Sequence, residues 1–175
     1  MTILPIVWAP DPILKTKCSP VSAVDDTIIK LMDDMLDTMY QAPGVGLAAP
    51  QIGVKKRIIV VDCSSKDENR APLRMINPEL VSVSDEETIS EEGCLSLPGH
   101  YANISRPAEV KVSYLDEAAE NRLVEVSGLL SVCIQHEIDH LNGILFIDHL
   151  SSLKRNMILK KMVKAKKERM GDSYE

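Results

Sequence analysis

The segment SGLLSVCIQHEIDHLNG, from Ser127 to Gly143, constrains the fold more than any other part of the chain. Ser127 or Gly128 can cap the start of a helix, and Gly143 can end it. The apolar residues between them lie on nearly every side of such a helix, which is typical of a buried helix rather than a surface one. The sequence therefore predicts a fold built around this segment.

Two histidines in this segment lie one helical turn apart. A helix places His136 and His140 on the same face, one above the other, so their imidazoles can bind one metal ion. Glu137 lies about 100° around the helix from His136, where a carboxylate can take a proton from water without being a ligand. A histidine pair without a metal is the alternative, and it is less favoured because two buried rings need polar partners.

A catalytic zinc-type site has three protein ligands and one open position, so a third ligand is needed. The longer pattern HExxHxxGxxH would require histidine at position 146, which is Phe146. Glu168 lies in a lysine-rich stretch that we expect to be exposed. Cys133 shares the face of the histidines, but the seven residues to His140 correspond to about 10.5 Å of helical rise. We therefore expect Cys133 to be a packed thiol, on a pocket wall, and not a ligand.

Cys94 is the remaining candidate for the third ligand. It lies in EEGCLSLPG, on an expected strand or strand end, and Gly93 before it would let another backbone segment approach closely. Buried cysteines without a metal are common, so spacing alone leaves both interpretations open. His100 and His149 stand alone in the sequence, and we expect both near the surface.

Composition indicates the class of protein. A chain of 175 residues with 45% hydrophobic and 26% charged residues is typical of one globular domain with a sizeable core. No apolar run approaches the ~20 residues of a membrane helix, and the N-terminus MTILPIVWAP lacks the basic front of a signal peptide. We therefore expect a cytoplasmic protein with no membrane partner. Its four cysteines, none in a CxxC pair, are expected to be free thiols: core residues, a metal ligand or a nucleophile.

The rest of the chain predicts an α+β fold, with small antiparallel or mixed sheets packed around the buried helix and with further N-terminal and C-terminal helices. Asp25 to Tyr40 has the apolar spacing of an amphipathic helix. Ala42 to Gly53, rich in glycine and proline, is expected to be a loop. Short strands are expected at residues 57–63, 80–83, 88–90, 110–115 and 123–126.

The C-terminal segment differs from the rest of the chain in charge. Residues 151–175 contain eight Lys or Arg and three Asp or Glu, a net +5, whereas residues 1–150 carry a net −11. From Ser151 onward we expect an amphipathic helix whose apolar side holds Leu153, Met157, Ile158, Met162 and Val163. We expect residues 1–150 to form a single catalytic domain, with residues 151–175 as a basic helix and tail appended to it.

Three segments together resemble the signature motifs of the peptide deformylases, in the same order and at similar separations. They are GVGLAAPQ (Gly44–Gln51), EGCLS (Glu92–Ser96) and QHEIDHLNG (Gln135–Gly143), and the resemblance extends over nearly the whole chain. HExxH alone is shared by unrelated metalloenzymes, whereas the three motifs together are specific. The resemblance implies a hydrolase that removes the N-formyl group from the formyl-methionine of nascent polypeptides and releases formate.

The resemblance also implies which residues act. One divalent ion, typically Fe²⁺ with Zn²⁺, Ni²⁺ or Co²⁺ as alternatives, would be held by Cys94, His136 and His140. Glu137 would transfer the proton, and the Gln51 side-chain amide and the Leu95 backbone N–H would stabilise the oxyanion.

The substrate methionine would enter an apolar pocket. Residues expected to contact the peptide or line this pocket are Val45, Gly46, Gly93, Tyr101, Leu129, Val132 and Cys133. Some deformylases have a cationic residue in the place of Tyr101, so a charge-based substrate contact is not expected there. Glu92, Arg106 and Asp139 are candidates to orient the ligands, with ordinary surface charges as the alternative.

Other interpretations remain open from the residues. One is a metallopeptidase that cuts internal bonds, against which the missing downstream ligand argues. Another is a non-catalytic protein with a structural metal, which normally requires a fourth protein ligand. Resemblance to deformylases of the Gram-negative type further implies that the C-terminal helix docks on the ribosome, where basic residues suit RNA phosphates. A solvated charged helix is the alternative.

Overall fold

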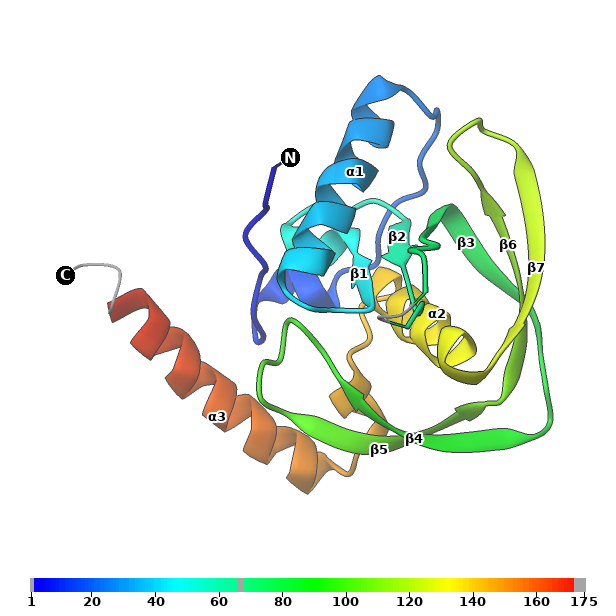
Figure 1. The fold of residues 1–175 in the computed structure, drawn as a ribbon. Helices are drawn as coiled ribbons and strands as arrows, with labels where there is room; N and C mark the ends of the chain where they lie inside the picture. Colours follow the sequence, from blue (N-terminus) through cyan, green and yellow to red (C-terminus); the bar gives the residue numbers. More distant parts are fainter. Residues whose placement is uncertain (1, 66–67, 172–175) are drawn as a thin grey trace.

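The computed structural model describes residues 2–65 and 68–171 and has the predicted α+β fold (Figure 1). A five-stranded sheet has the order β1-β2-β3-β6-β7, and a second sheet pairs β4 with β5. The strands are β1 (Gly46–Ala48), β2 (Ile58–Val61), β3 (Leu73–Val83), β4 (Glu87–Gly93), β5 (Tyr101–Pro107), β6 (Glu109–Leu115) and β7 (Asn121–Ser127). Neighbouring strands in both sheets pair antiparallel.

Three α-helices and three short 3-10 helices complete the described fold. They are η1 (Pro12–Lys15), α1 (Asp26–Gln41), η2 (Ala49–Ile52), α2 (Gly128–Leu141), η3 (Phe146–His149) and α3 (Ser152–Gly171). The predicted N-terminal helix is confirmed, and the side chain of Asp25 caps it by accepting a hydrogen bond from the backbone N–H of Ile28 at 3.0 Å. None of the helices in the described residues has the length and hydropathy of a membrane span.

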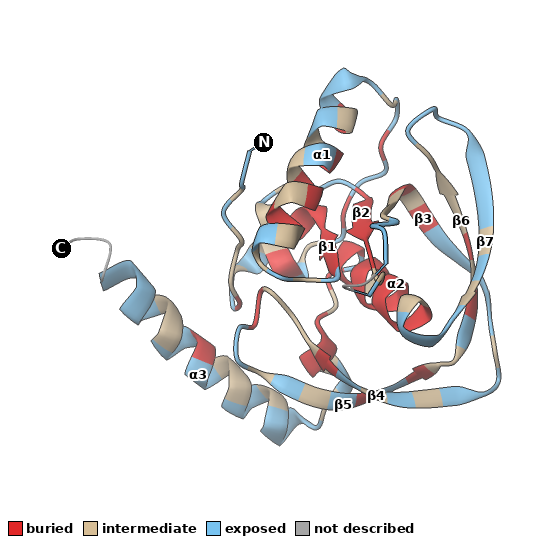
Figure 2. Ribbon diagram, viewed as in Figure 1, coloured by how far each residue is buried: buried red, intermediate tan, exposed pale blue. Residues whose placement is uncertain are grey.

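Helix α2 is the buried helix that the sequence predicts. Every residue from Ser131 to Ile138 is buried, and Figure 2 shows the helix at the centre of the molecule, between the two sheets and α1. Ile134 and Leu141 pack against residues of the five-stranded sheet in one apolar cluster. Gly143 follows the end of the helix with φ of 74°, a conformation that glycine adopts without strain.

The two-stranded sheet positions Cys94. In its last pair, Gly93 of β4 lies opposite Tyr101 of β5, and a Cβ atom at Gly93 would lie 2.6 Å from Cε1 of Tyr101. The absence of a side chain at Gly93 therefore lets the exposed ring of Tyr101 lie across the end of β4. Cys94 follows directly, at the strand end that the sequence predicts, and its carbonyl oxygen accepts a hydrogen bond from the N–H of Leu97 at 2.9 Å.

The prediction of a loop at residues 42–53 is wrong, because this segment contains β1 and η2. Gly46 lies opposite Val61 in the five-stranded sheet. Its glycine reflects a close contact rather than a turn, since a Cβ atom there would lie 2.4 Å from Oε1 of Glu137. Glycine content alone could not distinguish these two causes.

Helix α3 is confirmed, but its predicted apolar side is largely exposed. Leu153, Met157 and Val163 are 73%, 52% and 40% exposed, whereas Met162 is fully buried. Met162 packs in a cluster with Leu14 and other residues near the N-terminus. Ile158 and Leu159 pack, partly buried, against the same cluster, and Lys166 pairs with Asp11 at 3.3 Å. Helix α3 therefore contacts the N-terminal segment along one side, while its other side faces solvent at the edge of the molecule (Figure 1).

The glycine that ends α2 gives a test of the fold. An added Cβ at Gly143 would lie 2.6 Å from the carbonyl oxygen of Lys15, whereas Gly128, with φ of 62°, has nothing within 4 Å of an added Cβ. We expect Gly128→Ala to lower the free energy of unfolding by about 1–2 kcal/mol, from backbone strain alone. Gly143→Ala should lower it further, because two backbone segments must also separate. Urea denaturation measures both values, and equal losses would contradict the close contact.

Candidate active site

Three metal-ligating side chains from distant parts of the sequence come together beside α2. His136 and His140 are buried on the helix, and the partly buried Cys94 follows β4; one ligand atom from each lies within 4.8 Å of the other two. The Sγ atom of Cys94 lies 3.4 Å from Nε2 of His140. The centroids of the two imidazole rings are 5.0 Å apart. The fold thus brings together the three residues that the sequence singled out.

The spacing of these donors fits a divalent ion. Bonds of about 2.3 Å to sulfur and about 2.0–2.1 Å to nitrogen at a tetrahedral angle place the two ligand atoms about 3.5 Å apart. The observed separation between Cys94 and His140 is 3.4 Å. Burial lowers the pKa of His140 well below its usual value, so this ring is neutral, as a metal ligand must be.

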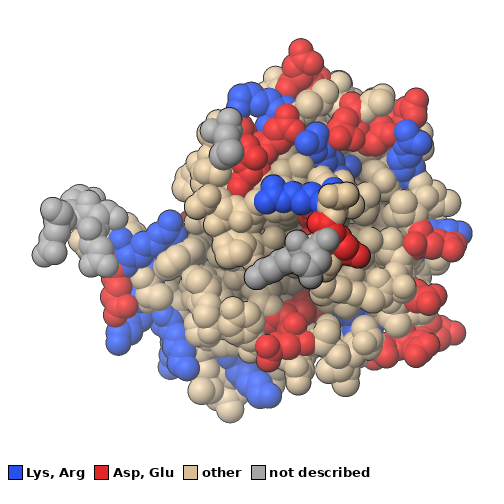
Figure 3. Space-filling view, viewed as in Figure 1, with Lys and Arg blue, Asp and Glu red and all other residues tan. Residues whose placement is uncertain are grey.

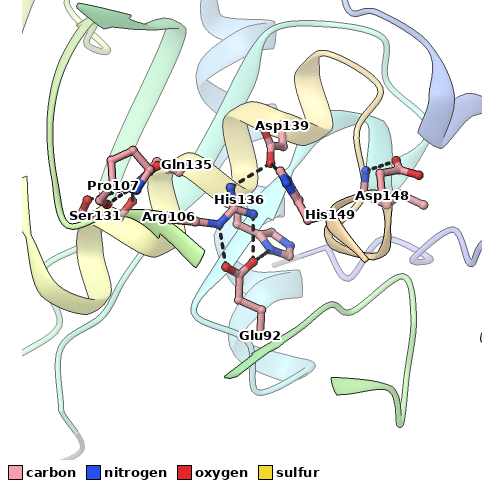
Figure 4. Close-up of polar contacts among 10 residues, drawn as sticks. Glu92, Arg106, Pro107, Ser131, Gln135, His136, Asp139, Asp148 and His149 are labelled. Carbon is pink, nitrogen blue, oxygen red and sulfur yellow. Dashed lines mark hydrogen bonds and ion pairs between the residues drawn. The ribbon is translucent and has the colours of Figure 1, made fainter. Parts of the chain in front are cut away.

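A chain of charged side chains orients His136 (Figure 4). Glu92 accepts hydrogen bonds from Nδ1 of His136 at 2.9 Å and from Nε and Nη2 of Arg106 at 2.6 and 3.0 Å. Nη1 of Arg106 also donates to Asp139, 2.9 Å away, whose Oδ2 lies 2.9 Å from Nε2 of His149. The bond to Glu92 leaves Nε2 of His136 as the nitrogen that can bind a metal. Glu92, Arg106 and Asp139 therefore form a network rather than separate surface charges.

The electrostatic surroundings of His136 favour positive charge. Burial alone would raise the pKa of Glu92, but hydrogen bonds from His136 and Arg106 outweigh it and lower this pKa to about 2. Burial likewise opposes a charge on His136, yet hydrogen bonds with Cys94 and Glu92 raise its pKa well above the usual value. A metal ion would take the place of the proton on this ring, because a metal ligand must be neutral, and the Glu92 carboxylate would then stabilise the charge of the ion.

Glu137 is buried beside the histidines and against β1. Its Oε2 atom has no hydrogen-bond partner in the described residues, and burial raises its pKa to about 7. Because Gly46 has no Cβ, the carboxylate can lie against the backbone of β1, and Glu137 lines the cleft described below. A buried carboxylate with an unused oxygen can accept a proton from a molecule bound in the cleft.

Gln51 is held with its amide nitrogen toward Cys94. Its Oε1 atom accepts a hydrogen bond from the N–H of Ala48 at 2.9 Å, which fixes the orientation of the amide. Nε2 then donates to Sγ of Cys94 at 3.4 Å and to Oγ of Ser96 at 3.2 Å. Sequence reasoning did not assign a role to Ser96. The sequence did indicate a possible role, because Ser96 belongs to the EGCLS segment. Its complete burial depends on the tertiary structure and could not be predicted from the sequence.

A cleft of about 410 Å³ opens onto the site. Its lining includes Gln51, Leu95 and all seven residues that were expected to contact substrate: Val45, Gly46, Gly93, Tyr101, Leu129, Val132 and Cys133. Val45, Leu129 and Tyr101 are 45%, 57% and 65% exposed, and apolar side chains gathered at a cleft mouth are typical of a binding site.

The two isolated histidines differ in their surroundings. His149 is exposed, as predicted, although it contacts Asp139. His100 is partly buried and lines the cleft, so its description as an isolated residue near the surface is incomplete. The sequence feature that indicated a place at the site was the position of His100 between two candidate site residues, Cys94 and Tyr101.

Comparison with known proteins identifies the family. Residues 3–156 match the sequence model of the family described as "Polypeptide deformylase". The chain belongs to this family. A peptide deformylase from Rhizobium meliloti (strain 1021) is 52% identical over 169 residues, which cover 97% of each chain.

Solved structures agree with this family assignment. A peptide deformylase from Ehrlichia chaffeensis has a TM-score of 0.91 and 39% identity, covering 97% of this chain and 99% of that one. A class I type b peptide deformylase from Acinetobacter baumannii, solved with Met-Ala-Ser bound, has a TM-score of 0.80 and 37% identity, covering 85% of this chain and 99% of that one.

Membership confirms the activity class that the three motifs predicted. This member of the deformylase family is a metal-dependent hydrolase that removes the N-formyl group from nascent polypeptides. The alternatives of a metallopeptidase and of a non-catalytic protein with a structural metal are therefore wrong.

The contact between Glu92 and His136 predicts an effect on metal affinity. Glu92→Gln keeps the side-chain size but removes the charge, so the bond to His136 weakens and Arg106 loses its closest buried counter-charge. We expect metal affinity to fall about 10- to 100-fold, measured by competition with a chelator. Glu91→Gln, at the exposed neighbouring position, is the matched control and should leave affinity unchanged. Wild-type affinity in Glu92→Gln would contradict the orienting role.

Proposed function

We propose that the chain hydrolyses N-formyl-methionyl peptides in the cleft, with Cys94, His136 and His140 as the ligands of one divalent ion. The observation that carries this proposal is the convergence of one sulfur and two ring nitrogens next to a buried carboxylate that has an unused oxygen. Cys94 and His136 also line the cleft, so a substrate can reach the ion.

The ion supplies a Lewis acid that polarises the formyl carbonyl and makes water acidic enough to react at neutral pH. A thiolate with two imidazoles suits several first-row metals. The proposed native ion is Fe²⁺, with Zn²⁺, Ni²⁺ and Co²⁺ as ions that this donor set also accepts.

Glu137 is proposed to move the proton. It accepts a proton from the attacking water, retains it in the buried cleft, and delivers it to the amine nitrogen as the C–N bond breaks. Formate and a peptide with a free amino terminus are the products. The missing side chain at Gly46 leaves the space that the Glu137 carboxylate occupies beside the cleft.

Gln51 and Leu95 are proposed to stabilise the negative charge that develops on the formyl oxygen. The donors are the amide Nε2 of Gln51, whose orientation is fixed by Ala48, and the backbone N–H of Leu95. Donors that are already in place need little reorganisation in the transition state, which makes them effective. Both residues line the cleft beside Cys94.

The cleft walls are proposed to select the methionine side chain. Leu129, Val132 and Cys133 in the first turns of α2, together with Val45, form an apolar surface that suits an unbranched thioether. Gly46, Gly93 and Tyr101 border the peptide backbone. The deformylase from Acinetobacter baumannii binds Met-Ala-Ser in its solved structure, which supports a peptide as the occupant of the cleft in this chain.

Replacing Glu137 tests the mechanism. Glu137→Gln removes the proton acceptor but changes the volume little, so we expect metal content to stay the same and kcat to fall about 10²- to 10⁴-fold. Formate release from formyl-Met-Ala-Ser, with metal analysis of the same samples, measures both quantities. Glu125→Gln, at an exposed position on β7, is the control and should retain full activity. Wild-type turnover in Glu137→Gln would contradict the mechanism.

Helix α3 is proposed to be a basic appendage that docks on the ribosome, where nascent substrates emerge, which places the activity in the cytoplasm. Lysines line its exposed surface, and Figure 3 shows mostly blue Lys and Arg side chains along this helix, whereas blue and red side chains are mixed over the rest of the visible face. Removing the helix would also remove the buried Met162, so charge substitutions are a cleaner test than truncation.

Replacing exposed lysines tests the docking. We expect Lys160, Lys161, Lys164 and Lys167, changed together to Gln, to weaken ribosome binding and to reduce its salt dependence, because fewer phosphates are neutralised. Sedimentation with 50S subunits at two salt concentrations measures both effects. The matched control changes the exposed Lys17, Lys30, Lys55 and Lys56 to Gln and should bind like the wild type. Equal binding by both variants would contradict docking through α3.

A further inference from the structure

The segment that carries Val45 into the cleft wall has little rigidity of its own. Val45 is 45% exposed at the cleft and directly precedes β1. It lies between Gly44 and Gly46, and glycine leaves the backbone more conformational freedom than other residues do. Contacts with other parts of the chain must therefore hold Val45 if the cleft wall is to keep one shape.

Two backbone hydrogen bonds anchor this segment. The N–H of Gly44 donates to the carbonyl oxygen of Met39, near the end of α1, at 2.9 Å. The N–H of Asp62 donates to the carbonyl oxygen of Val45, also at 2.9 Å. Asp62 directly follows β2, so this second bond lies beyond the last residue pair that joins β1 to β2. The position of Val45 thus depends on how firmly Asp62 is held.

Hydroxyl groups hold the side chain of Asp62. Its Oδ2 atom accepts a hydrogen bond from the hydroxyl of Tyr40 at 2.5 Å, and Oδ1 accepts bonds from the N–H and the hydroxyl of Ser64. Burial would raise the pKa of Asp62, but these hydrogen bonds outweigh it and lower the pKa. Burial and the bond to Asp62 raise the pKa of Tyr40 to about 12. At neutral pH the phenol therefore donates to a charged carboxylate, which is a strong type of hydrogen bond.

The bond between Tyr40 and Asp62 closes a ring of contacts around the segment. Tyr40 follows Met39 in α1, the residue that anchors Gly44. Its hydroxyl bonds to Asp62, the residue that anchors Val45. Asp62 is only 6% exposed, and the cost of burying a carboxylate offsets much of what its hydrogen bonds contribute to stability. Its main effect is therefore to fix the orientation of the backbone that it anchors.

We propose that Tyr40 and Asp62 are positioning residues for substrate binding, whose hydrogen bond keeps Val45 against the methionine side chain of the substrate. This role rests on the proposed function, because Val45 belongs to the wall that receives that side chain. Neither Tyr40 nor Asp62 is among the residues that line the cleft, so both act through the backbone of Val45. The bond that fixes Gln51 involves neither side chain. Peptide binding should therefore depend on the pair more strongly than the rate of the chemical step does.

Tyr40→Phe tests the positioning, because it removes the hydroxyl and keeps the ring, which packs against the apolar cluster of α1 and β2. We expect KM for formyl-Met-Ala-Ser and Kd for the product Met-Ala-Ser to rise about three- to tenfold, the effect of one hydrogen bond, with kcat within about twofold of the wild type. Formate release measures KM and kcat, and calorimetry of the metal-loaded enzyme measures Kd. Tyr114→Phe, at a partly buried tyrosine on β6 outside the cleft, is the matched control and should behave like the wild type.

A double-variant cycle shows whether the bond itself is responsible. Asp62→Ala should raise KM and Kd at least as much as Tyr40→Phe does. Adding Tyr40→Phe to Asp62→Ala should raise them no further, because the bond is already lost. Effects that multiply would show that the two side chains act separately and would overturn the proposal. Wild-type KM and Kd in Tyr40→Phe, together with a lower melting temperature, would also overturn it, because the bond would then contribute to stability alone.

The peptide-binding measurement separates the positioning from the proposed function. A higher Kd in Tyr40→Phe, in a protein whose wild type releases no formate, would sink the proposed function and leave the positioning role standing. Formate release with unchanged KM and Kd in Tyr40→Phe would sink the positioning role and leave the proposed function standing.

Discussion

The contact between Sγ of Cys94 and Nε2 of His140, 3.4 Å long, is the interaction on which the rest of the site depends. It joins the end of the two-stranded sheet to the central helix, two parts of the chain that are 46 residues apart in sequence. A thiolate and two imidazoles are costly to bury together without a cation. Metal binding therefore contributes to holding the small sheet against α2, and folding and metal affinity are coupled.

The charged network around His136 makes this contact possible. A buried pair such as Glu92 and Arg106 is not a strong source of stability, because desolvation offsets much of the attraction. Its effect here is orientation: Glu92 fixes one nitrogen of His136, and Arg106 connects Glu92 to Asp139 on the same helix. The ring is thus held before a metal arrives. Gly46 and Gly93 act similarly, by allowing Glu137 and Tyr101 to lie closer to the backbone than any side chain would permit.

Local sequence patterns predicted the parts of the fold that depend on local periodicity. The helical spacing of His136 and His140 placed both on one face, and Gly143 marked the end of α2. The choice of Cys94 over other third ligands could not come from spacing, because it depends on how the small sheet meets the helix. Family resemblance supplied that choice, and the fold brings the residue to the histidines.

The predictions that failed depended on tertiary partners. Apolar spacing in residues 152–171 indicated a helix with one buried face, but Met162 is the only buried residue among the described residues of α3. The glycines of residues 42–53 indicated a loop, but Gly46 lies in a strand. The residue there is glycine because a side chain would overlap the carboxylate of Glu137. The burial of Ser96 and the position of His100 on the cleft wall likewise depend on which segments meet in three dimensions.

X-ray absorption spectroscopy of the metal-loaded protein tests the central claim most directly. We expect one sulfur at about 2.3 Å and two imidazole nitrogens at about 2.0–2.1 Å from the ion, with a remaining position that a small anion can enter and leave. A spectrum without sulfur, or with a fourth protein ligand that closes the coordination sphere, would contradict the account.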